Sequence, residues 1–267
     1  MARCRTGNRA NITGATLRNP TKRPAAKTDM RAMEKVPGIF PTQESRIGLC
    51  NVGEHKIELQ EGAGVVCVKL RKCGPFKEAE MNRQTKEYLE MDIIEPSDSE
   101  FSSNVLLVPK RDNTFRFAVD YRELNAITKK NMYPMEDIQS IFDSLGGSSI
   151  FSRLDCLHGF FQVKLAEEDK HKTAFRVPGV PGGHYQFKRM CFGLQGSPGT
   201  FCRIIDRIFC DIRSSFLANY VGDLLTHSQS FEKHLDHLEE VCKRLQSAGL
   251  KIKPSKCFFG FDEVKFL

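Results

Sequence analysis

The stretch Phe216–Ser228, FLANYVGDLLTHS, decides the fold, because two short apolar runs flank the step Tyr220-Val221-Gly222-Asp223. Apolar runs on both sides of a Gly-Asp pair are typical of a β-hairpin whose turn holds the glycine. A second carboxylate, Asp155, ends another apolar run upstream in IFSRLDCLHGFFQ. If that strand pairs with the hairpin, two carboxylates share one acidic pocket and, with a polyphosphate, can hold divalent cations for phosphoryl transfer. An ordinary Gly-Asp turn explains the same letters, so the rest of the chain must decide.

Hydrophobic periodicity predicts the surrounding elements. We expect helices over 77–90, from Pro134 to Leu145, from Ser197 to Ile212 and from Ser230 to Gly249, and strands over 104–108, 114–120, 149–154, 173–176 and 184–188. This order predicts an α+β fold in which helices cover one face of an antiparallel sheet.

Three local features carry expectations of their own. Ile138 begins the apolar stripe of the helix after Pro134, so we expect it to be buried. The acidic run at 166–170 is typical of a solvated turn rather than a metal site. His234 and His237 have no metal-site spacing, so we expect them on an exposed helix face.

Composition narrows the class of protein. The 267 residues, 40% of them hydrophobic, suffice for a large core, and no apolar run is long enough for a signal peptide or a membrane span. We therefore expect an intracellular protein, cytoplasmic or nuclear, with no membrane partner. Ten cysteines without Cys-x-x-Cys spacing indicate neither a zinc site nor a disulfide framework.

The net charge of +7 is concentrated at the N-terminus. Residues 1–37 hold nine Lys and Arg against two acidic residues, which leaves 31 of each sign in the remainder. The overall charge therefore says nothing about the globular part. Residues 1–40 lack periodicity and are interrupted by Gly14, Pro20, Pro24 and Pro37, so we interpret them as a basic disordered tail or linker.

Two cations lie on the hairpin that spans 104–120. Strand alternation puts Phe115, Phe117 and Val119 on one face and Arg116 on the other, near Lys110 of the turn. Such a pair could bind a polyphosphate. From the spacing alone, we favour an ordinary charged turn and a salt-bridged strand residue.

Several ordered blocks together resemble one family. They are IIEPSDSEFSSNVLLVPKRDNTFRFAVDYRELNAITKKNMYPM (93–135), FSRLDCLHGFFQ (151–162), HKTAF (171–175), YQFKRMCFGLQGSPGTF (185–201), YVGD (220–223) and SAGLKIKPSKCFF (247–259). Each block is weak by itself, but their order and separation are specific. From about Gly48 onward the chain resembles the reverse transcriptase domain of gypsy-type LTR retrotransposons and, more distantly, of retroviruses.

The resemblance implies a fingers–palm polymerase fold and an RNA-directed DNA polymerase that joins nucleotides with two Mg²⁺ ions, or Mn²⁺ in their place. Asp155 is implied as a ligand of both metal ions, and Asp223 as the supporting aspartate of the Tyr-x-Asp-Asp box. Lys256 is implied as the group that protonates the leaving pyrophosphate.

The resemblance also implies the substrates: deoxynucleoside triphosphates and an RNA or DNA template-primer. Lys110 and Arg116 are implied to bind the triphosphate, and Phe160 to lie under the sugar and exclude a 2′-hydroxyl. Phe192 and Gly193 are implied to line the nucleotide site. As alternatives from the residues alone, Phe160 is a core aromatic, with adjacent Phe161 the better core candidate. No oligomeric state follows.

The implied domains are fingers over about 41–133 and 163–198 and palm over about 134–162 and 199–267. We expect this chain to lack the thumb that follows the palm in the family.

Two departures from the family pattern bear on activity. The box reads YVGD, with Gly222 where the first aspartate is expected, and Cys191 replaces the usual proline before Phe192. Glycine supplies no side-chain oxygen, so we expect impaired catalysis. The alternative function is a catalytically inactive retroelement relic that still binds nucleic acid.

Overall fold

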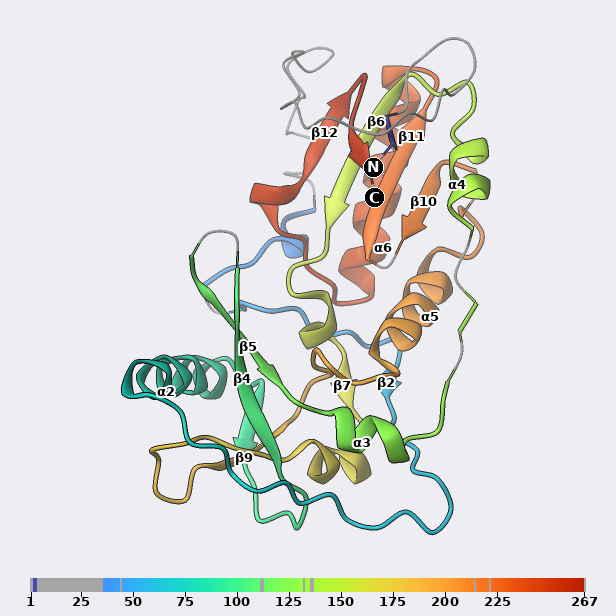
Figure 1. The fold of residues 1–267 in the computed structure, drawn as a ribbon. Coiled ribbons are helices and arrows are strands. Elements are labelled where there is room, and N and C mark those ends of the chain that lie inside the picture. The colour runs from blue at the N-terminus through green and yellow to red at the C-terminus, as the bar shows by residue number, and fades with distance from the viewer. Residues whose placement is uncertain are drawn as a thin grey trace. The chain divides into compact units, whose positions relative to one another are not determined.

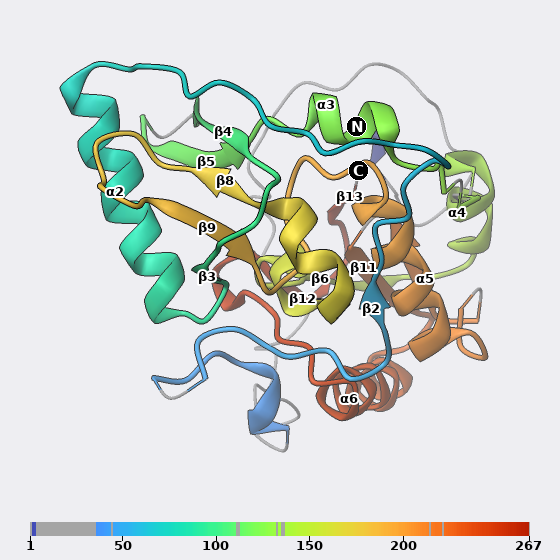
Figure 2. The ribbon, with the colours of Figure 1, turned by 90° about the horizontal axis from the view of Figure 1, so that it is seen from below.

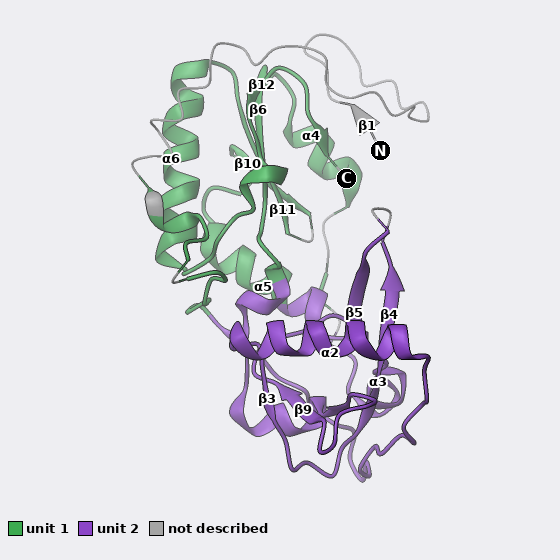
Figure 3. Cartoon of the chain, turned by 90° about the vertical axis from the view of Figure 1, so that its left-hand side faces the viewer, with its two compact units in different colours: residues 1–52, 133–159, 201–267 green, residues 53–132, 160–200 purple. Residues whose placement is uncertain are grey.

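The computed structural model describes residues 2–3, 36–43, 45–110, 113–131, 133–134, 137–213, 215–220 and 222–266. The chain forms two compact units (Figure 3): unit 1 comprises residues 1–52, 133–159 and 201–267, and unit 2 comprises residues 53–132 and 160–200. Most of the predicted basic tail, from residue 4 to residue 35, lies outside the described residues. Val36 and Ile39, near the end of the predicted tail of residues 1–40, are described and buried.

Unit 1 contains a four-stranded antiparallel sheet in the order β10-β11-β6-β12. Its elements are β1 (Ala2–Arg3), η1 (Pro37–Ile39), α4 (Ile138–Ser144), β6 (Ile150–Asp155), α5 (Ser197–Phe209, in unit 1 from Phe201), β10 (Leu217–Tyr220), β11 (Asp223–Ser228), α6 (Phe231–Ser247), η4 (Pro254–Lys256), β12 (Phe258–Phe261) and β13 (Lys265–Phe266) (Figure 1). The predicted hairpin is confirmed as β10 and β11, and the predicted antiparallel sheet as the sheet that they share with β6.

One face of this sheet is closed by α6. The helix begins after Ser230, whose hydroxyl accepts a hydrogen bond from the Lys233 amide, and it ends before Gly249, which has a φ of +72°. On β6, the side chains of Ser152 and Leu154 lie on the face that α6 covers, and both residues are fully buried. Leu238 and Val241 of α6 are buried as well, so this face belongs to the core.

The prediction of an exposed histidine face on α6 is wrong. His234 is fully buried and hydrogen bonds through Nε2 to Ser152 Oγ at 2.7 Å and through Nδ1 to Ser228 Oγ at 2.9 Å. His237 also reaches Ser228 Oγ, at 2.8 Å. Periodicity placed His234 outside the stripe because histidine counts as polar, but two serine hydroxyls under the sheet satisfy both of its ring nitrogens.

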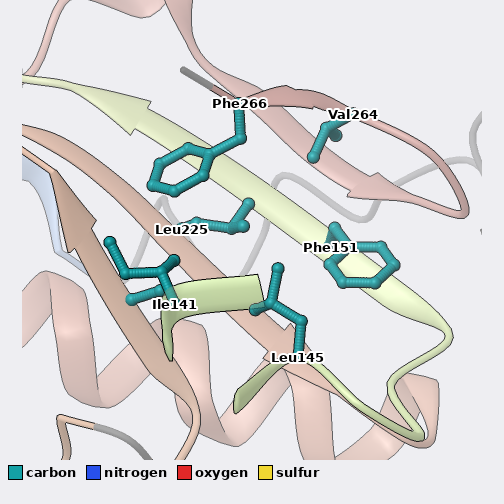
Figure 4. Close-up of a cluster of buried hydrophobic side chains, with 7 residues drawn as sticks. Ile141, Leu145, Phe151, Leu225, Val264 and Phe266 are labelled. Atoms are coloured by element: carbon teal, nitrogen blue, oxygen red, sulfur yellow. The ribbon is translucent and has the colours of Figure 1, made fainter. Parts of the chain in front are cut away.

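The opposite face of the same sheet carries a separate apolar cluster. Phe151 of β6 and Leu225 of β11 pack with Ile141 of α4, with Leu145 directly after α4 and with Phe266 of β13 (Figure 4). Asp137 caps α4 by accepting hydrogen bonds from the amides of residues 139 and 140. Ile138, expected in the core, is 43% exposed, because the helix is only two turns long and its first residue lies at the rim.

Unit 2 contains a mixed five-stranded sheet in the order β3-β9-β8-β4-β5, in which only the pairing of β4 with β8 is parallel. Its elements are β2 (Glu54–His55), α2 (Pro75–Glu90), β3 (Ile94–Pro96), β4 (Ser103–Pro109), β5 (Phe115–Val119), α3 (Arg122–Ile127), η2 (Gly159–Gln162, in unit 2 from Phe160), β7 (Lys164–Leu165), η3 (Glu167–Thr173), β8 (Phe175–Arg176) and β9 (His184–Phe187). Figure 2 shows α2 running alongside this sheet. The predicted hairpin and the predicted second strand pair are confirmed as β4–β5 and β8–β9.

The prediction of a solvated turn at 166–170 is wrong for two residues, Ala166, which is fully buried, and Asp169. Asp169 in η3 is 4% exposed, accepts a hydrogen bond from the Ile57 amide at 2.8 Å and forms an ion pair with Lys172. Glu167 and Glu168 beside it are exposed, as expected. The acidic run therefore contains one buried anchor, which composition alone could not distinguish from its exposed neighbours.

Among the described helices, none is both long enough and apolar enough to cross a bilayer.

Candidate active site

The two carboxylates singled out by the sequence meet in unit 1. Asp155, the last residue of β6, is the direct cross-strand partner of Asp223, the first residue of β11. Directly opposed residues of an antiparallel pair point to the same face, with their Cβ atoms about 5 Å apart. Both side chains are about one-fifth to one-quarter exposed, at 20% and 26%. The structure thus brings these residues together as predicted, on the face opposite α6.

Each carboxylate already has a cation from its own chain. Lys256 Nζ lies 3.2 Å from Asp155 Oδ2, and Arg153 Nη2 lies 2.8 Å from Asp223 Oδ2. Lys256 is brought there because the backbone of 251–253 pairs with that of 155–157, through Lys253 N–H to Asp155 O and Leu157 N–H to Lys251 O. Arg153 also donates to the Lys265 carbonyl at 3.2 Å. These ion pairs keep negative charge from accumulating at the end of the two strands.

Gly222 occupies a position that glycine suits. Its φ is +96°, in the region that side chains of other residues disfavour. A Cβ atom at this position would come within 2.9 Å of Cε1 of Phe201, a fully buried residue of α5. A side chain at 222 would therefore point at Phe201, whereas Asp223 shares a face with Asp155.

Two thiols lie beside Asp155. The Asp155 amide is 3.5 Å from Cys257 Sγ, and Cys156 follows directly in the chain. Burial raises the pKa of the Cys257 thiol to about 11 and raises the pKa of Cys156 further above its usual value. Both thiols are therefore neutral near pH 7 and add no charge to the carboxylate pair.

In unit 2 the implied nucleotide residues fall on three segments: the β4–β5 hairpin, η2 and the turn that holds Phe192 and Gly193. Arg116 lies on β5 opposite Val108 of β4, and its side chain is exposed. Lys110 follows β4, and its amide donates to the Thr114 carbonyl at 2.8 Å, which extends the ladder by one pair. Residues 111–112 of the predicted turn lie outside the described part of the chain.

Of the implied aromatic residues, Phe192 contacts the Arg116 guanidinium and Phe160 contacts Phe192. The Arg116 guanidinium carbon lies 5.5 Å from the centre of the Phe192 ring, within the range of a cation–π contact. The Phe160 ring is 4.9 Å from that of Phe192. Phe161, the expected core aromatic, is 4% exposed, whereas Phe160 is only half-buried. Arg116, Phe160 and Phe192 thus form one partly exposed surface, and Gly193 follows Phe192 with its backbone exposed.

Residues 108–267 match the family model described as reverse transcriptase (RNA-dependent DNA polymerase). The chain belongs to the reverse transcriptase family. It is 31% identical over 214 residues to the Transposon Tf2-3 and Tf2-4 polyproteins of Schizosaccharomyces pombe, and these matches cover 80% of the chain and 16% of each polyprotein. The predicted resemblance to a retrotransposon reverse transcriptase is confirmed, and the chain spans about one-sixth of the length of these relatives.

Solved reverse transcriptases share the fold. The native protease–reverse transcriptase of Prototype Foamy Virus superposes with a TM-score of 0.75 at 23% identity, covering 87% of this chain and 31% of that one. A foamy viral protease–reverse transcriptase in complex with an RNA/DNA hybrid gives 0.79 at 19% identity, covering 97% and 36%. The fingers–palm fold expected from the sequence is confirmed.

Sequence reasoning missed two residues near the carboxylate pair of unit 1, Arg153 and Phe201. Arg153 lies two residues before Asp155 on the same strand, so alternation alone could have placed it beside the carboxylates. Phe201 was assigned to the core, which is right, but only the structure shows its ring against Gly222. No pattern in the sequence connects those two positions.

Proposed function

We propose that this chain is the RNA-directed DNA polymerase domain of a retrotransposon polyprotein. The observation that carries the proposal is the direct pairing of Asp155 with Asp223 at the end of two palm-type strands, within a chain of the reverse transcriptase family. Carboxylate oxygens are the ligands that Mg²⁺ and Mn²⁺ prefer. Asp155 and Asp223 fit one such ion because they share a face and are partly exposed.

In this proposal Asp155 and Asp223 hold the divalent metal, with Mg²⁺ as the natural ion. When bound, the metal supplies charge stabilisation to the reacting phosphate. Lys256, within 3.2 Å of Asp155, supplies a proton to the leaving pyrophosphate. The box YVGD keeps a single carboxylate, Asp223, so we expect slow turnover.

The substrate side of the proposal rests on unit 2. Lys110 and Arg116 bind the triphosphate of a deoxynucleotide. Phe160 and Phe192 contact its sugar and base, and Phe160 excludes a 2′-hydroxyl. A foamy viral relative has been solved with an RNA/DNA hybrid and another with double-stranded DNA, which supports a nucleic-acid template-primer as the partner here.

Primer extension on an RNA template, with Mg²⁺ or Mn²⁺, tests this function. We expect extension by the unmodified chain, and a loss of about a thousandfold or more in Asp155→Asn, because a metal ligand is worth several kcal/mol of barrier. Asp236→Asn, on the exposed side of α6, is the matched control and should extend like the unmodified chain. Extension that survives Asp155→Asn would refute the assignment.

Nucleic-acid binding without turnover is the second candidate. It is favoured by the absence of a side-chain oxygen at Gly222 and by the ion pairs that already neutralise Asp155 and Asp223. It requires affinity for an RNA–DNA duplex that falls steeply with salt, with no extension under any metal. Affinity that does not change with salt would remove this candidate.

A further inference from the structure

The turn Cys191–Gln195 carries Phe192 and Gly193, and a neighbouring segment holds it in place. Ser197 Oγ donates to the Cys191 carbonyl at 3.0 Å, and the Ser197 amide donates to the Leu194 carbonyl at 3.2 Å. These bonds close the turn on itself. They do not fix where the turn lies in unit 2.

Asn125 of α3 supplies that missing constraint. Its Nδ2 donates to the Gly193 carbonyl at 2.8 Å, and its Oδ1 accepts from the Gln195 amide at 2.9 Å. One amide side chain thus uses both its donor and its acceptor on two backbone groups of the same turn. Asn125 is 70 residues away from Gln195 in sequence, so the contact is tertiary and not part of a local turn motif.

The residues packed against Gly193 also restrict the position of the turn. Gly193 has a φ of +98°, and a Cβ atom there would lie 3.0 Å from the Val119 carbonyl oxygen and 3.4 Å from the Tyr121 ring. Tyr121 is itself buried and donates its hydroxyl to the Thr173 carbonyl at 2.8 Å. Residues 119–125 therefore hold the turn through the close approach of Val119 and Tyr121 to Gly193 and through the two hydrogen bonds of Asn125.

These contacts of residues 119–125 determine where the Phe192 ring lies. Phe192 directly precedes the clamped glycine, and its ring contacts both the Arg116 guanidinium, at 5.5 Å, and the Phe160 ring, at 4.9 Å. A turn that moved by one ångström would break the alignment of these three groups.

We propose that Asn125 is a positioning residue for nucleotide binding: its two hydrogen bonds hold the turn so that Phe192 can orient Arg116 and Phe160 toward a deoxynucleoside triphosphate. The proposal rests on the proposed function, because it takes that nucleotide as the ligand of Arg116. Asn125 itself need not touch the nucleotide.

The test measures dATP affinity of the full chain bound to an RNA template with a dideoxy-terminated primer, in Mg²⁺. Asn125→Leu removes both hydrogen bonds, and we expect dATP to bind about tenfold more weakly. Asn125→Asp has the same shape and keeps the acceptor for Gln195, but it places a carboxylate oxygen against the Gly193 carbonyl. We expect a similar loss, with hydrogen exchange at the Gln195 amide still slow.

Three controls separate positioning from general damage. Gln60→Leu removes a different side-chain bond to α3, from Gln60 Nε2 to the Ala126 carbonyl at 3.1 Å, and should leave dATP affinity unchanged. Affinity for the template-primer should stay the same in both Asn125 variants; if it falls in step with dATP affinity, the role is merely structural and the proposal fails. Arg116→Ala should weaken dATP binding.

Wild-type dATP affinity in both Asn125 variants, with weakened binding in Arg116→Ala, would overturn the positioning role while the nucleotide site stands. Unchanged affinity in Arg116→Ala as well would overturn the proposed nucleotide site and, with it, this inference.

Discussion

Gly222→Asp would return a carboxylate to the place where the family carries the first aspartate of its box, and we expect it to destabilise unit 1 rather than repair the site. The reason is local and steric. The backbone at 222 has a φ of +96°, and the first side-chain carbon would meet the Phe201 ring at 2.9 Å. Phe201 is 1% exposed, so its ring has no solvent to move into.

Two terms set the magnitude. A residue other than glycine in the left-handed region costs about 1–3 kcal/mol, the lower part of that range for Asp. Carbon atoms pack at roughly 3.5–4.0 Å, so a contact at 2.9 Å overpacks the core and costs about 1–3 kcal/mol more. The free energy of unfolding should therefore fall by about 2–6 kcal/mol in Gly222→Ala and by about 2–5 kcal/mol in Gly222→Asp.

Urea unfolding of four variants separates the terms. Gly159→Ala is the matched control, because its Cβ would lie 2.9 Å from Cζ of the same Phe201 ring, but Gly159 has no positive φ. The difference between Gly222→Ala and Gly159→Ala then measures the backbone term. The double variant Gly222→Ala with Phe201→Leu should recover the steric part, which appears as a coupling energy of about 1–3 kcal/mol.

Mn²⁺ binding by Gly222→Asp completes the test. The new carboxylate starts in the direction of the buried Phe201 ring, so we expect no gain in Mn²⁺ affinity. If Gly222→Asp unfolds at the same urea concentration as the unmodified chain and binds Mn²⁺ more tightly, the steric reasoning is refuted. Zero coupling between Gly222→Ala and Phe201→Leu would refute the contact with Phe201 alone.

Two further predictions concern buried charge. Burial lowers the pKa of His227 and His234 to about 4, so both histidines stay neutral in the folded chain, whereas in the unfolded chain they take up protons near pH 6.5. Urea unfolding should therefore show full stability above pH 6.5 and a loss of up to about 3 kcal/mol per histidine as the pH falls toward 4. His234→Gln should reduce this loss, and a stability that does not change with pH would contradict the prediction. Asp169→Asn leaves the Lys172 ammonium without its anion and should lower the unfolding free energy by about 3–5 kcal/mol, whereas Glu168→Gln on the exposed side should change it little; equal effects would show that Asp169 is no anchor.

The strands and helices that could be read from the sequence are those in which burial follows a simple period. The apolar runs at 150–155 and 223–228 correctly placed Asp155 and Asp223 at strand ends that meet, although both faces of these two strands are buried. Inferring burial from hydrophobic periodicity failed for His234, because a polarity scale treats histidine as exposed even where serine hydroxyls hydrogen bond to its ring. It failed for Ile138 because two turns are too short for a stripe to be buried along its whole length.

Contacts that depend on tertiary structure left no such trace. Asn125 lies in a short helix with no periodic signal, and its value comes from two backbone groups 68 and 70 residues further on. Phe201 belongs to an obvious apolar stripe, which predicts burial but not that its ring fills the space beside Gly159 and Gly222. Hydrophobic periodicity predicts which face of an element is buried, but it does not predict which residue packs against that face.

The letters YVGD, compared position by position with the family box, suggest that the first carboxylate is lost and the second is a bystander. Strand register leads to a different assignment. Asp223 is the residue paired with Asp155 and facing the same way, while the direction from Gly222 leads into the core at Phe201. Losing a side chain at 222 and keeping a carboxylate opposite Asp155 are therefore separable changes, and Asp223→Asn should lower Mn²⁺ affinity as strongly as Asp155→Asn. An Asp223→Asn variant that binds Mn²⁺ like the unmodified chain would show that the register does not define the metal ligands.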